Sequence, residues 1–295
     1  MDETNRAIRH VTILGHPQRP QSEPLAGEIA SILRGRGVEV WVATQWSEDD
    51  AEIAARCAAA DAVIAIGGDG AMLRAGRVTS HHAVPVLGVN LGRLGFLAEV
   101  APDEIPRALD MLLTGQYWIE QRMMVDVDLW RDEQRLEMGD ALNDVVIGRD
   151  APLGLVQLEA YIDHDWTTTY GCDALIISTA TGSTAYALAS GGPILPPELR
   201  NILIVPVAPH LSLDRPIVLP EGATVDIVVA EDNVHPVVVA VDGASITALK
   251  HGDLVRVQAS EHGASFIRLR GRPYFYRSLL DHLEPRVTTA PRPRT

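Results

Sequence analysis

The chain has 295 residues, a formal net charge of −14 and a hydrophobic content of 46%, which predicts a globular protein of about two domains rather than a disordered chain. Its negative charge argues against nucleic acid and anionic membranes as partners, and no apolar run approaches the ~20 residues of a membrane span. The two cysteines, Cys57 and Cys172, lack metal or redox spacing, which is typical of a protein in a reducing cytoplasm.

The chain contains a single lysine, Lys250, in the turn-like sequence ALKHGD. A P-loop and a protein-kinase site each need a lysine on the phosphates, in a motif that is absent here. Any phosphate must therefore be bound by arginine, by metal ions or by backbone N–H groups.

Strand-like and helix-like segments alternate through the first hundred residues. This alternation predicts a parallel sheet covered on both faces by helices, as an α/β domain over residues 1–117. We expect its strands at 10–15, 38–44, 61–67 and 84–90, and its helices at 24–37, 47–60, 70–78 and 102–114.

Apolar and polar residues alternate, with turn signals between the segments, from about residue 118 to 265. This pattern predicts a mostly antiparallel all-β domain, interrupted by one helix at 181–192. Residues 266–285 predict a strand and a helix that return to the first domain, and the Pro/Arg-rich residues 286–295 predict a disordered tail. The expected strands include 122–130, 141–148, 155–163, 223–230, 236–243 and 253–260.

The sequence VIAIGGDGAMLRAGR places one carboxylate, Asp69, among three glycines at the end of a buried strand. Parallel sheets bind ligands at this end. We expect the glycines to adopt conformations closed to other residues and to let a ligand come close. The N-terminus of the following helix favours an anion, and Asp69 could accept a proton or bind a metal ion. In the alternative interpretation, Asp69 only caps that helix.

A second unusual stretch, STATGSTAYALASGGP, covers residues 178–193. Thr181 and Thr184 lie where we expect the helix to begin, so their hydroxyls and the backbone N–H groups could bind an anion. An ordinary Ser/Thr-capped helix is the alternative. Two glycine-rich sites in different domains favour a cleft between the domains.

Three acidic positions accompany these stretches. Asn143 and Asp144 lie midway along an apolar segment, where a polar pair must find hydrogen bonds or a ligand. Asp173 precedes the strand that leads to the second glycine-rich stretch. Asp242, in AVDGAS, is expected to make a hairpin turn.

These motifs resemble those of the NAD kinase family, in the family's order and over nearly the whole chain. The resemblance rests on GGDG, VLGVNLGRLGFLAEV, ALNDVVI, YGCDALIISTATGSTAYALASGGPIL and VPVAPHLSLDRPIVLP. GGDG alone is weakly specific, because phosphofructokinases and diacylglycerol-type lipid kinases share it, whereas the TGSTAY stretch is highly specific. The resemblance implies a phosphofructokinase-like N-terminal domain, and transfer of phosphate to the adenosine-ribose 2′-hydroxyl of NAD, which gives NADP.

The resemblance also implies roles for single residues. Asp69 would be the general base, near Mg²⁺ carried by the phosphoryl donor, which is ATP or polyphosphate. Gly68 and Gly70 would let the donor and the ribose approach. The remaining residues would contact substrate: Arg74 near a phosphate, Phe96 beside a ring, Asn143 and Asp144 at the ribose and adenine, Thr181 at the helix start, and Asp173, Thr184, Ala185, Tyr186 and Ala189 along NAD. An exposed helix arginine is the alternative for Arg74, and a core residue is the alternative for Phe96.

Four residues depart from the family pattern. Asp144 stands where glutamate is usual, Ala71 where threonine is usual, Ala174 where glycine is usual and Ala180 where proline is usual. Since Asp69 and the Thr184–Tyr186 segment are intact, we still expect activity. The choice of donor stays open, and so does acceptance of NADH, for which the small Gly171 beside Asp173 could leave space.

NAD and ATP are the expected partners, and the family resemblance implies a homodimer or homotetramer. A sugar-phosphate kinase could share the GGDG turn, but it would need a cluster of basic residues. A nucleotide-sensing module could keep the NAD contacts without turnover, against which the intact Asp69 argues.

Overall fold

Four parallel strands form one end of the molecule in the computed structural model, which describes residues 7–47, 51–92, 95–273, 275–276 and 279. The strands are β1 (His10–Gly15), β2 (Glu39–Ala43), β3 (Ala62–Gly67) and β4 (Val86–Asn90), and their order in the sheet is β2-β1-β3-β4. All three neighbouring pairs are parallel. The predicted parallel sheet is therefore confirmed.

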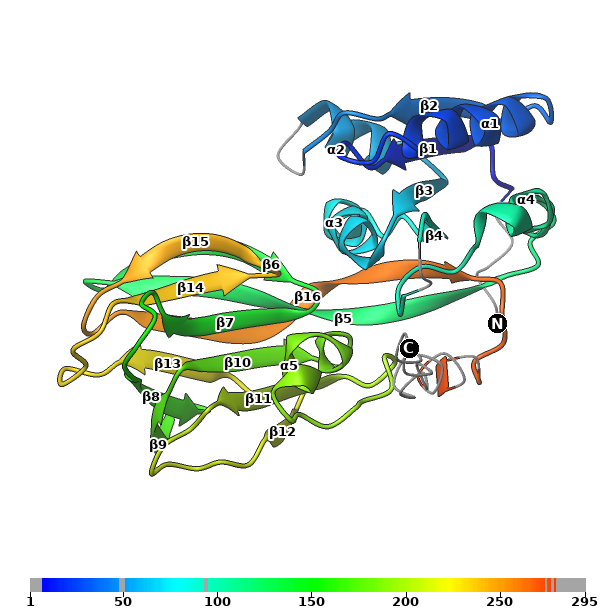
Figure 1. Cartoon of the computed structure of the whole chain (residues 1–295). Helices are drawn as coiled ribbons and strands as arrows, with labels where there is room; N and C mark the ends of the chain where they lie inside the picture. The colour runs from blue at the N-terminus through cyan, green and yellow to red at the C-terminus, as the bar shows by residue number, and fades with distance from the viewer. Residues whose placement is uncertain (1–6, 48–50, 93–94, 274, 277–278, 280–295) are drawn as a thin grey trace, which may run out of the picture.

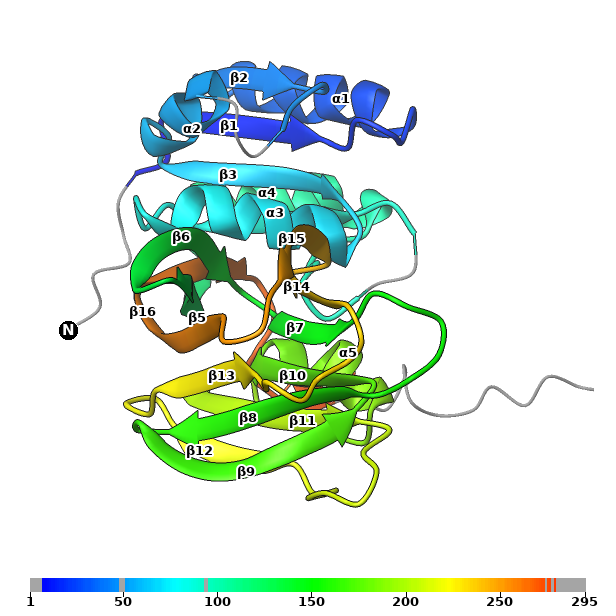
Figure 2. The ribbon, with the colours of Figure 1, turned by 90° about the vertical axis from the view of Figure 1, so that its left-hand side faces the viewer.

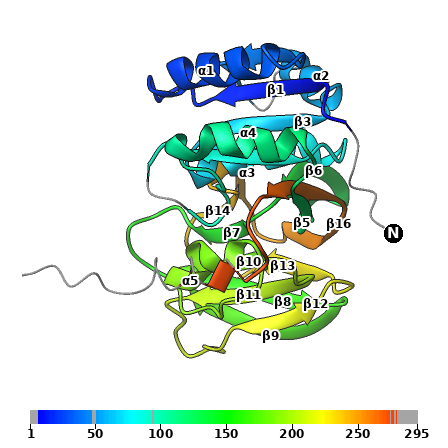
Figure 3. The same ribbon diagram turned by 90° about the vertical axis from the view of Figure 1, so that its right-hand side faces the viewer.

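Helices cover both faces of this sheet, as the alternating pattern predicts (Figures 1 and 3). On one face, α1 (Ser22–Arg34) and α4 (Ile105–Leu113) bury Ile29 and Leu109; the short 3₁₀ helix η1 (Pro102–Glu104) precedes α4. On the other face, α2 (Ala51–Ala58) and α3 (Asp69–Ser80) bury Cys57 and Met72. The sheet thus lies between two apolar layers.

Two long strands, β5 (Trp118–Arg131) and β16 (Leu254–Arg268), lie side by side and run from one half of the molecule to the other (Figure 1). β16 pairs in parallel with β4 through Phe266 and Val86, and antiparallel with β5 and β13. The parallel strands therefore continue into a ten-stranded mixed sheet. The boundaries at residues 117 and 265 stay predictions, and β16 runs across the second of them.

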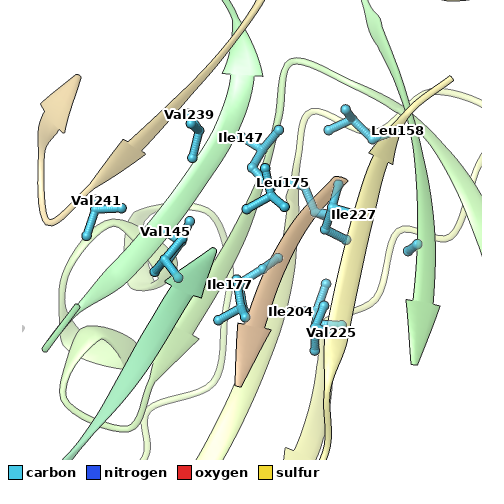
Figure 4. Close-up of a cluster of buried hydrophobic side chains, with 14 of the residues drawn as sticks. Val145, Ile147, Leu158, Leu175, Ile177, Ile204, Val225, Ile227, Val239 and Val241 are labelled. Carbon is cyan, nitrogen blue, oxygen red and sulfur yellow. The ribbon is translucent and has the colours of Figure 1, made fainter. Parts of the chain in front are cut away.

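The β-rich half packs its sheets against one another around a core of Val, Ile and Leu side chains such as Val145, Leu175 and Ile227 (Figures 2 and 4). The predicted mostly antiparallel β domain is confirmed, because the strand pairs within this half are antiparallel. Its remaining strands are β6 (Gln134–Ala141), β7 (Asp144–Arg149), β8 (Val156–Ile162), β9 (Asp165–Cys172), β10 (Ala174–Thr179), β11 (Asn201–Val207), β12 (Ile217–Pro220), β13 (Val225–Val229), β14 (Val237–Val241) and β15 (Ala244–Leu249).

Two predicted elements differ in the structure. The helix expected at 181–192 is a 3₁₀ turn, η2 (Gly182–Thr184), followed by the four-residue helix α5 (Tyr186–Ala189), because Ala185 has a non-helical backbone with φ −101° and ψ −126°. The strand expected at 141–148 is divided by a bend, so Asn143 lies between β6 and β7 and Asp144 begins β7.

The C-terminal prediction is tested only in part. The strand of the return segment is the end of β16, whereas most of the helix expected after it, and the whole tail 286–295, lie outside the described residues. Cys57 and Cys172 are both buried and form no disulfide. None of the helices within the described ranges is long and apolar enough to cross a membrane.

Candidate active site

Asp69 lies at the first position of α3, and only Gly68 separates it from the end of β3 at Gly67. Its carboxylate accepts backbone hydrogen bonds from Phe96 at 2.8 Å, Leu97 at 3.1 Å and Ala98 at 3.4 Å. It does not cap α3, whose N-cap residue is Gly68, so the capping alternative is wrong. An ionised carboxylate has about four acceptor positions. Three donors therefore fix the side chain and leave room for one more.

Close packing requires glycine at Gly67, one of the three glycines that the sequence singled out around Asp69, and at Gly95, which the sequence did not single out. A Cβ on Gly95 would lie 2.1 Å from Asp69 Oδ1, and a Cβ on Gly67 would lie 2.5 Å from the Ala71 Cβ. Gly68 instead has an extended backbone, with φ −102° and ψ −171°, which any residue can adopt. None of Gly67, Gly68 and Gly70 has a positive φ, so the expectation that they adopt conformations closed to other residues is wrong. A Cβ at Gly68 or Gly70 would meet no described atom within 4 Å, which leaves space for a ligand.

Arg122 of β5 connects the two glycine-rich stretches. It is 3% exposed, and it donates to Glu120 at 2.8 Å and to the Thr181 hydroxyl at 3.4 Å. Burial lowers the pKa of Arg122 to about 10, and the charges of Glu120 and Asp69 act against this shift. Asp69 and Thr181 therefore share one buried cation, which brings the two predicted stretches to one site.

The Asn143 bend and the TGST segment are packed directly on each other. The Asn143 carbonyl accepts hydrogen bonds from Thr179 N at 2.9 Å and from Ser178 Oγ at 3.1 Å. A Cβ on Gly182 would lie 2.2 Å from that carbonyl oxygen, so only glycine fits. This contact fixes how the segment that begins at Thr181 leaves β10.

Four predicted substrate residues line the accessible side of that segment. Thr184 and Ala185 are half-buried, whereas Tyr186 and Ala189 are exposed and Ala187 between them is buried against Ile176 and Leu203. Because α5 has only four residues, the anion site expected at the start of a long helix is not formed there.

Asp144 and Asp242 form a buried pair of carboxyl groups at the start of β7. Burial, and next the charge of Asp242, raise the pKa of Asp144 to about 7. Burial also raises the pKa of Asp242, against the effect of three backbone N–H donors and Arg77. Asp242 makes the expected hairpin turn, between β14 and β15, and its φ of +47° is one that Asp tolerates.

The other predicted residues do not all lie at this centre. Arg74 lies on α3, and Phe96 lies in the segment that donates hydrogen bonds to Asp69. Asp173 and Gly171 precede β10, at the opposite end of that strand from Ser178, which pairs with Asp144. Arg74 stacks on the Trp46 ring at 4.7 Å, and the Phe96 ring contacts Phe275 at 6.3 Å. Asp173 accepts a hydrogen bond from Arg149 at 2.9 Å. Gly171 is buried on β9, with its carbonyl bonded to His210 N at 2.8 Å.

Within the described residues, no three or more His, Cys, Asp or Glu side chains are grouped so that they could hold one metal ion. Asp69 is the carboxylate nearest to the glycine-rich turn, and its two oxygens already accept backbone hydrogen bonds. One anchored carboxylate fits a metal ion that arrives with phosphate, because Mg²⁺ is usually bound by one or two carboxylates together with substrate phosphates.

Arg122 and Asp242 are the two central residues to which sequence reasoning assigned no role at the site. Alternation along β5 places Glu120 and Arg122 on the face of the buried Met124. A charged pair on a buried face could have indicated the position of Arg122. Asp242 had no such signal, because an Asp-Gly pair is ordinary in a hairpin turn.

Matches to known proteins cover most of the chain. A family model described as the ATP-NAD kinase N-terminal domain matches residues 11–117, and one described as the C-terminal domain matches residues 142–269. The NAD kinase of Chloroflexus aurantiacus is 39% identical over 277 residues, which cover 94% of this chain and 99% of that protein. The NAD kinase of Moorella thermoacetica is 35% identical over 273 residues, or 91% of this chain and 87% of that one.

Two solved structures share the fold. The yeast NADH kinase complexed with NADH aligns with a TM-score of 0.82 and 23% identity, over 98% of this chain and 91% of that chain. An NAD kinase from Archaeoglobus fulgidus in complex with ATP aligns with a TM-score of 0.72 and 22% identity, over 93% of this chain and 98% of that chain.

Proposed function

This chain belongs to the NAD kinase family of enzymes, and we propose that it transfers the terminal phosphate of ATP to the adenosine-ribose 2′-hydroxyl of NAD, with Asp69 as the general base. The observation that carries the proposal is the anchored carboxylate of Asp69. It lies at the carboxyl end of β3, where open space adjoins Gly68 and Gly70.

The base works by orientation. The N–H groups of residues 96–98 hold the Asp69 carboxylate, so that its remaining acceptor position can receive the proton of the 2′-hydroxyl. The ribose oxygen then bonds to the γ-phosphorus as the bond from that phosphorus to the ADP oxygen breaks. A positioned carboxylate contributes about 10²–10⁴-fold to such a step.

The donor is expected to enter with Mg²⁺ as part of the substrate, where the ion neutralises phosphate charge. The chain offers arginines and backbone N–H groups in place of a phosphate-binding lysine. Arg74, one turn into α3, supports the assignment of a phosphate to this side of Asp69. Polyphosphate is an alternative donor of the same chemistry.

NAD is expected to lie along the second stretch. The exposed Tyr186 and Ala189 and the half-buried Thr184 and Ala185 offer a surface for it. Asn143, Asp144 and Asp173 would bind its ribose hydroxyls and amides. Gly171 and Phe96 would leave space for its rings and pack beside them.

The test is a coupled assay for NADP formation from NAD, ATP and Mg²⁺. Asp69→Asn is expected to lose about 10²–10⁴-fold in kcat with a nearly unchanged KM for NAD. Asp103→Asn, which changes an exposed residue of η1, is the matched control and should retain full activity. Full activity in Asp69→Asn would exclude the base assignment. A folded wild type that makes no NADP with any donor would favour a sugar-phosphate kinase or a nucleotide sensor.

We also propose a homo-oligomer. Four exposed apolar side chains lie on β12 or in the segments next to β11, namely Leu199, Leu211, Leu213 and Val218. Exposed apolar side chains favour an interface where they form one contiguous patch. Light scattering should give a dimeric or tetrameric mass, and a monomeric mass would contradict the proposal.

A further inference from the structure

The side chain of Asp242 is fully buried, although its position in a hairpin turn does not require this. The Asp242-Gly243 turn between β14 and β15 has positive φ angles at both residues, +47° and +81°. Such a turn forms whether or not the aspartate side chain is buried. The Asp242 side chain nevertheless has 0% exposure. Its carboxylate therefore makes contacts that the turn itself does not need.

That carboxylate organises the bend before β7. Its oxygens accept backbone hydrogen bonds from Leu142 at 2.9 Å, Asn143 at 2.8 Å and Asp144 at 3.1 Å. A buried backbone N–H group without a hydrogen-bond partner costs folding free energy. Here one carboxylate accepts hydrogen bonds from the N–H groups of three consecutive residues. The Asp242 backbone N–H also donates to the Asp144 carbonyl at 2.9 Å. The orientation of Asn143 and Asp144 thus depends on Asp242.

The same carboxylate faces the helix that carries Asp69. Arg77 of α3 lies 4.0 Å from Asp242, and the β14–β15 hairpin lies beside α3 in the ribbon (Figure 2). Arg77 also acts electrostatically on Asp140 at the end of β6. A half-buried cation of the α/β half, Arg77, therefore faces a buried anion that shapes the NAD side of the site.

Asp144 is the group on which Asp242 acts electrostatically. Asp144 is 6% exposed, and among the described residues Asp242, on the β14–β15 turn, is the charged group that shifts its titration. On the neighbouring strand β10, the residue paired with Asp144 is the uncharged Ser178. Protonation of Asp144 is thus governed by burial and by one neighbouring negative charge, which Arg77 partly offsets.

We propose that Asp242 is a positioning residue, which orients the Asn143–Asp144 bend for NAD and whose charge makes NAD binding depend on pH near neutrality. The inference rests on the proposed function, because it takes NAD as the ligand. An ionised Asp144 accepts hydrogen bonds from ribose hydroxyls, and a protonated one offers fewer acceptor positions. The affinity for NAD should therefore rise as the pH rises through about 7.

The experiment measures the KM for NAD in the coupled assay, and the Kd of NAD by calorimetry without donor, between about pH 5 and pH 9. In the wild type both constants should fall as the pH rises through neutrality. In Asp242→Asn that transition should move about one unit to lower pH, because a like charge is removed. Its KM should also rise several-fold, with a smaller change in kcat. In Asp144→Asn the transition should be absent.

A matched control is Asp163→Asn. Asp163 also has a positive φ, +52°, in a hairpin turn, and its carboxylate also accepts a backbone hydrogen bond, from Thr224. It lies in the β8–β9 turn, and it should leave the pH profile unchanged. If Asp242→Asn does not fold, Arg77→Leu serves instead. It should change the pH profile of NAD binding, because Arg77 lowers the pKa of Asp242, and an unchanged profile would contradict the role of Asp242.

Failure of the inference can be distinguished from failure of the proposed function. Profiles of Asp242→Asn and of the wild type that superimpose would overturn the role of Asp242, whatever the activity. Calorimetric NAD binding with the expected pH dependence but without NADP formation would support Asp242 and refute the kinase assignment. No NAD binding at any pH would overturn both.

Discussion

Replacement of Arg122 by methionine is expected to destabilise the protein. Arg122 is 3% exposed, and its guanidinium lies 2.7 Å from the Glu120 carboxylate, which is also buried. Although burial opposes it, the charges of Arg122 and Arg268 lower the pKa of Glu120, so Glu120 stays ionised. Methionine fills much of the volume but leaves this carboxylate with Arg268 as its remaining cation, at 2.6 Å.

The expected loss follows from that geometry. Removing one partner of a buried ion pair typically costs 3–5 kcal/mol, because the other charge is left buried. Arg268 still compensates part of the Glu120 charge, so we expect a loss at the lower end, about 3 kcal/mol. The loss of the hydrogen bond to Thr181 adds in the same direction.

Urea unfolding of the wild type and of Arg122→Met measures this difference. The matched control is Arg200→Met, which removes an arginine from an exposed pair with Glu221, whose partners are 48% and 42% exposed. An exposed pair contributes at most about 1 kcal/mol. Equal losses of unfolding free energy in the two variants would refute the reasoning that burial determines the cost.

Two further predictions concern stability and catalysis. Burial and the charge of Asp242 raise the pKa of Asp144 from its ordinary 3.8 to about 7 in the folded chain, so the wild type loses stability as the pH rises between these values. Asp144→Asn should therefore become more stable relative to the wild type by up to about 4 kcal/mol from pH 4 to pH 8. Urea unfolding at both pH values checks this, and a difference that does not change with pH would contradict it. Gly95→Ala should lower kcat at least tenfold, because its Cβ would collide with the Asp69 carboxylate. Gly92→Ala meets no described atom within 4 Å and is the control; equal kcat in both variants would argue against the contact.

Local sequence signals determined the elements of the α/β half. The strand expected at 10–15 has those bounds in β1, and the glycine-rich turn after the strand at 61–67 lies where β3 ends. These predictions hold because apolar periodicity and glycine stops act within a few residues. Position at the carboxyl end of a parallel sheet likewise indicated Asp69.

Only the tertiary structure decided how the site is held. Arg122 reaches Thr181 across 59 positions of the chain, and Asp242 reaches Leu142 across 100. Long-range contacts also occur at the two elements that local patterns predicted wrongly, the continuous strand at 141–148 and the helix at 181–192. The Asn143 bend is paired by Asp242, and Gly182, in the helix expected at 181–192, is pressed against the Asn143 carbonyl. Hydrophobic periodicity indicates which element a segment favours by itself. The backbone groups of the Asn143 bend and of Gly182 instead contact distant segments, and this packing overrides the local preference.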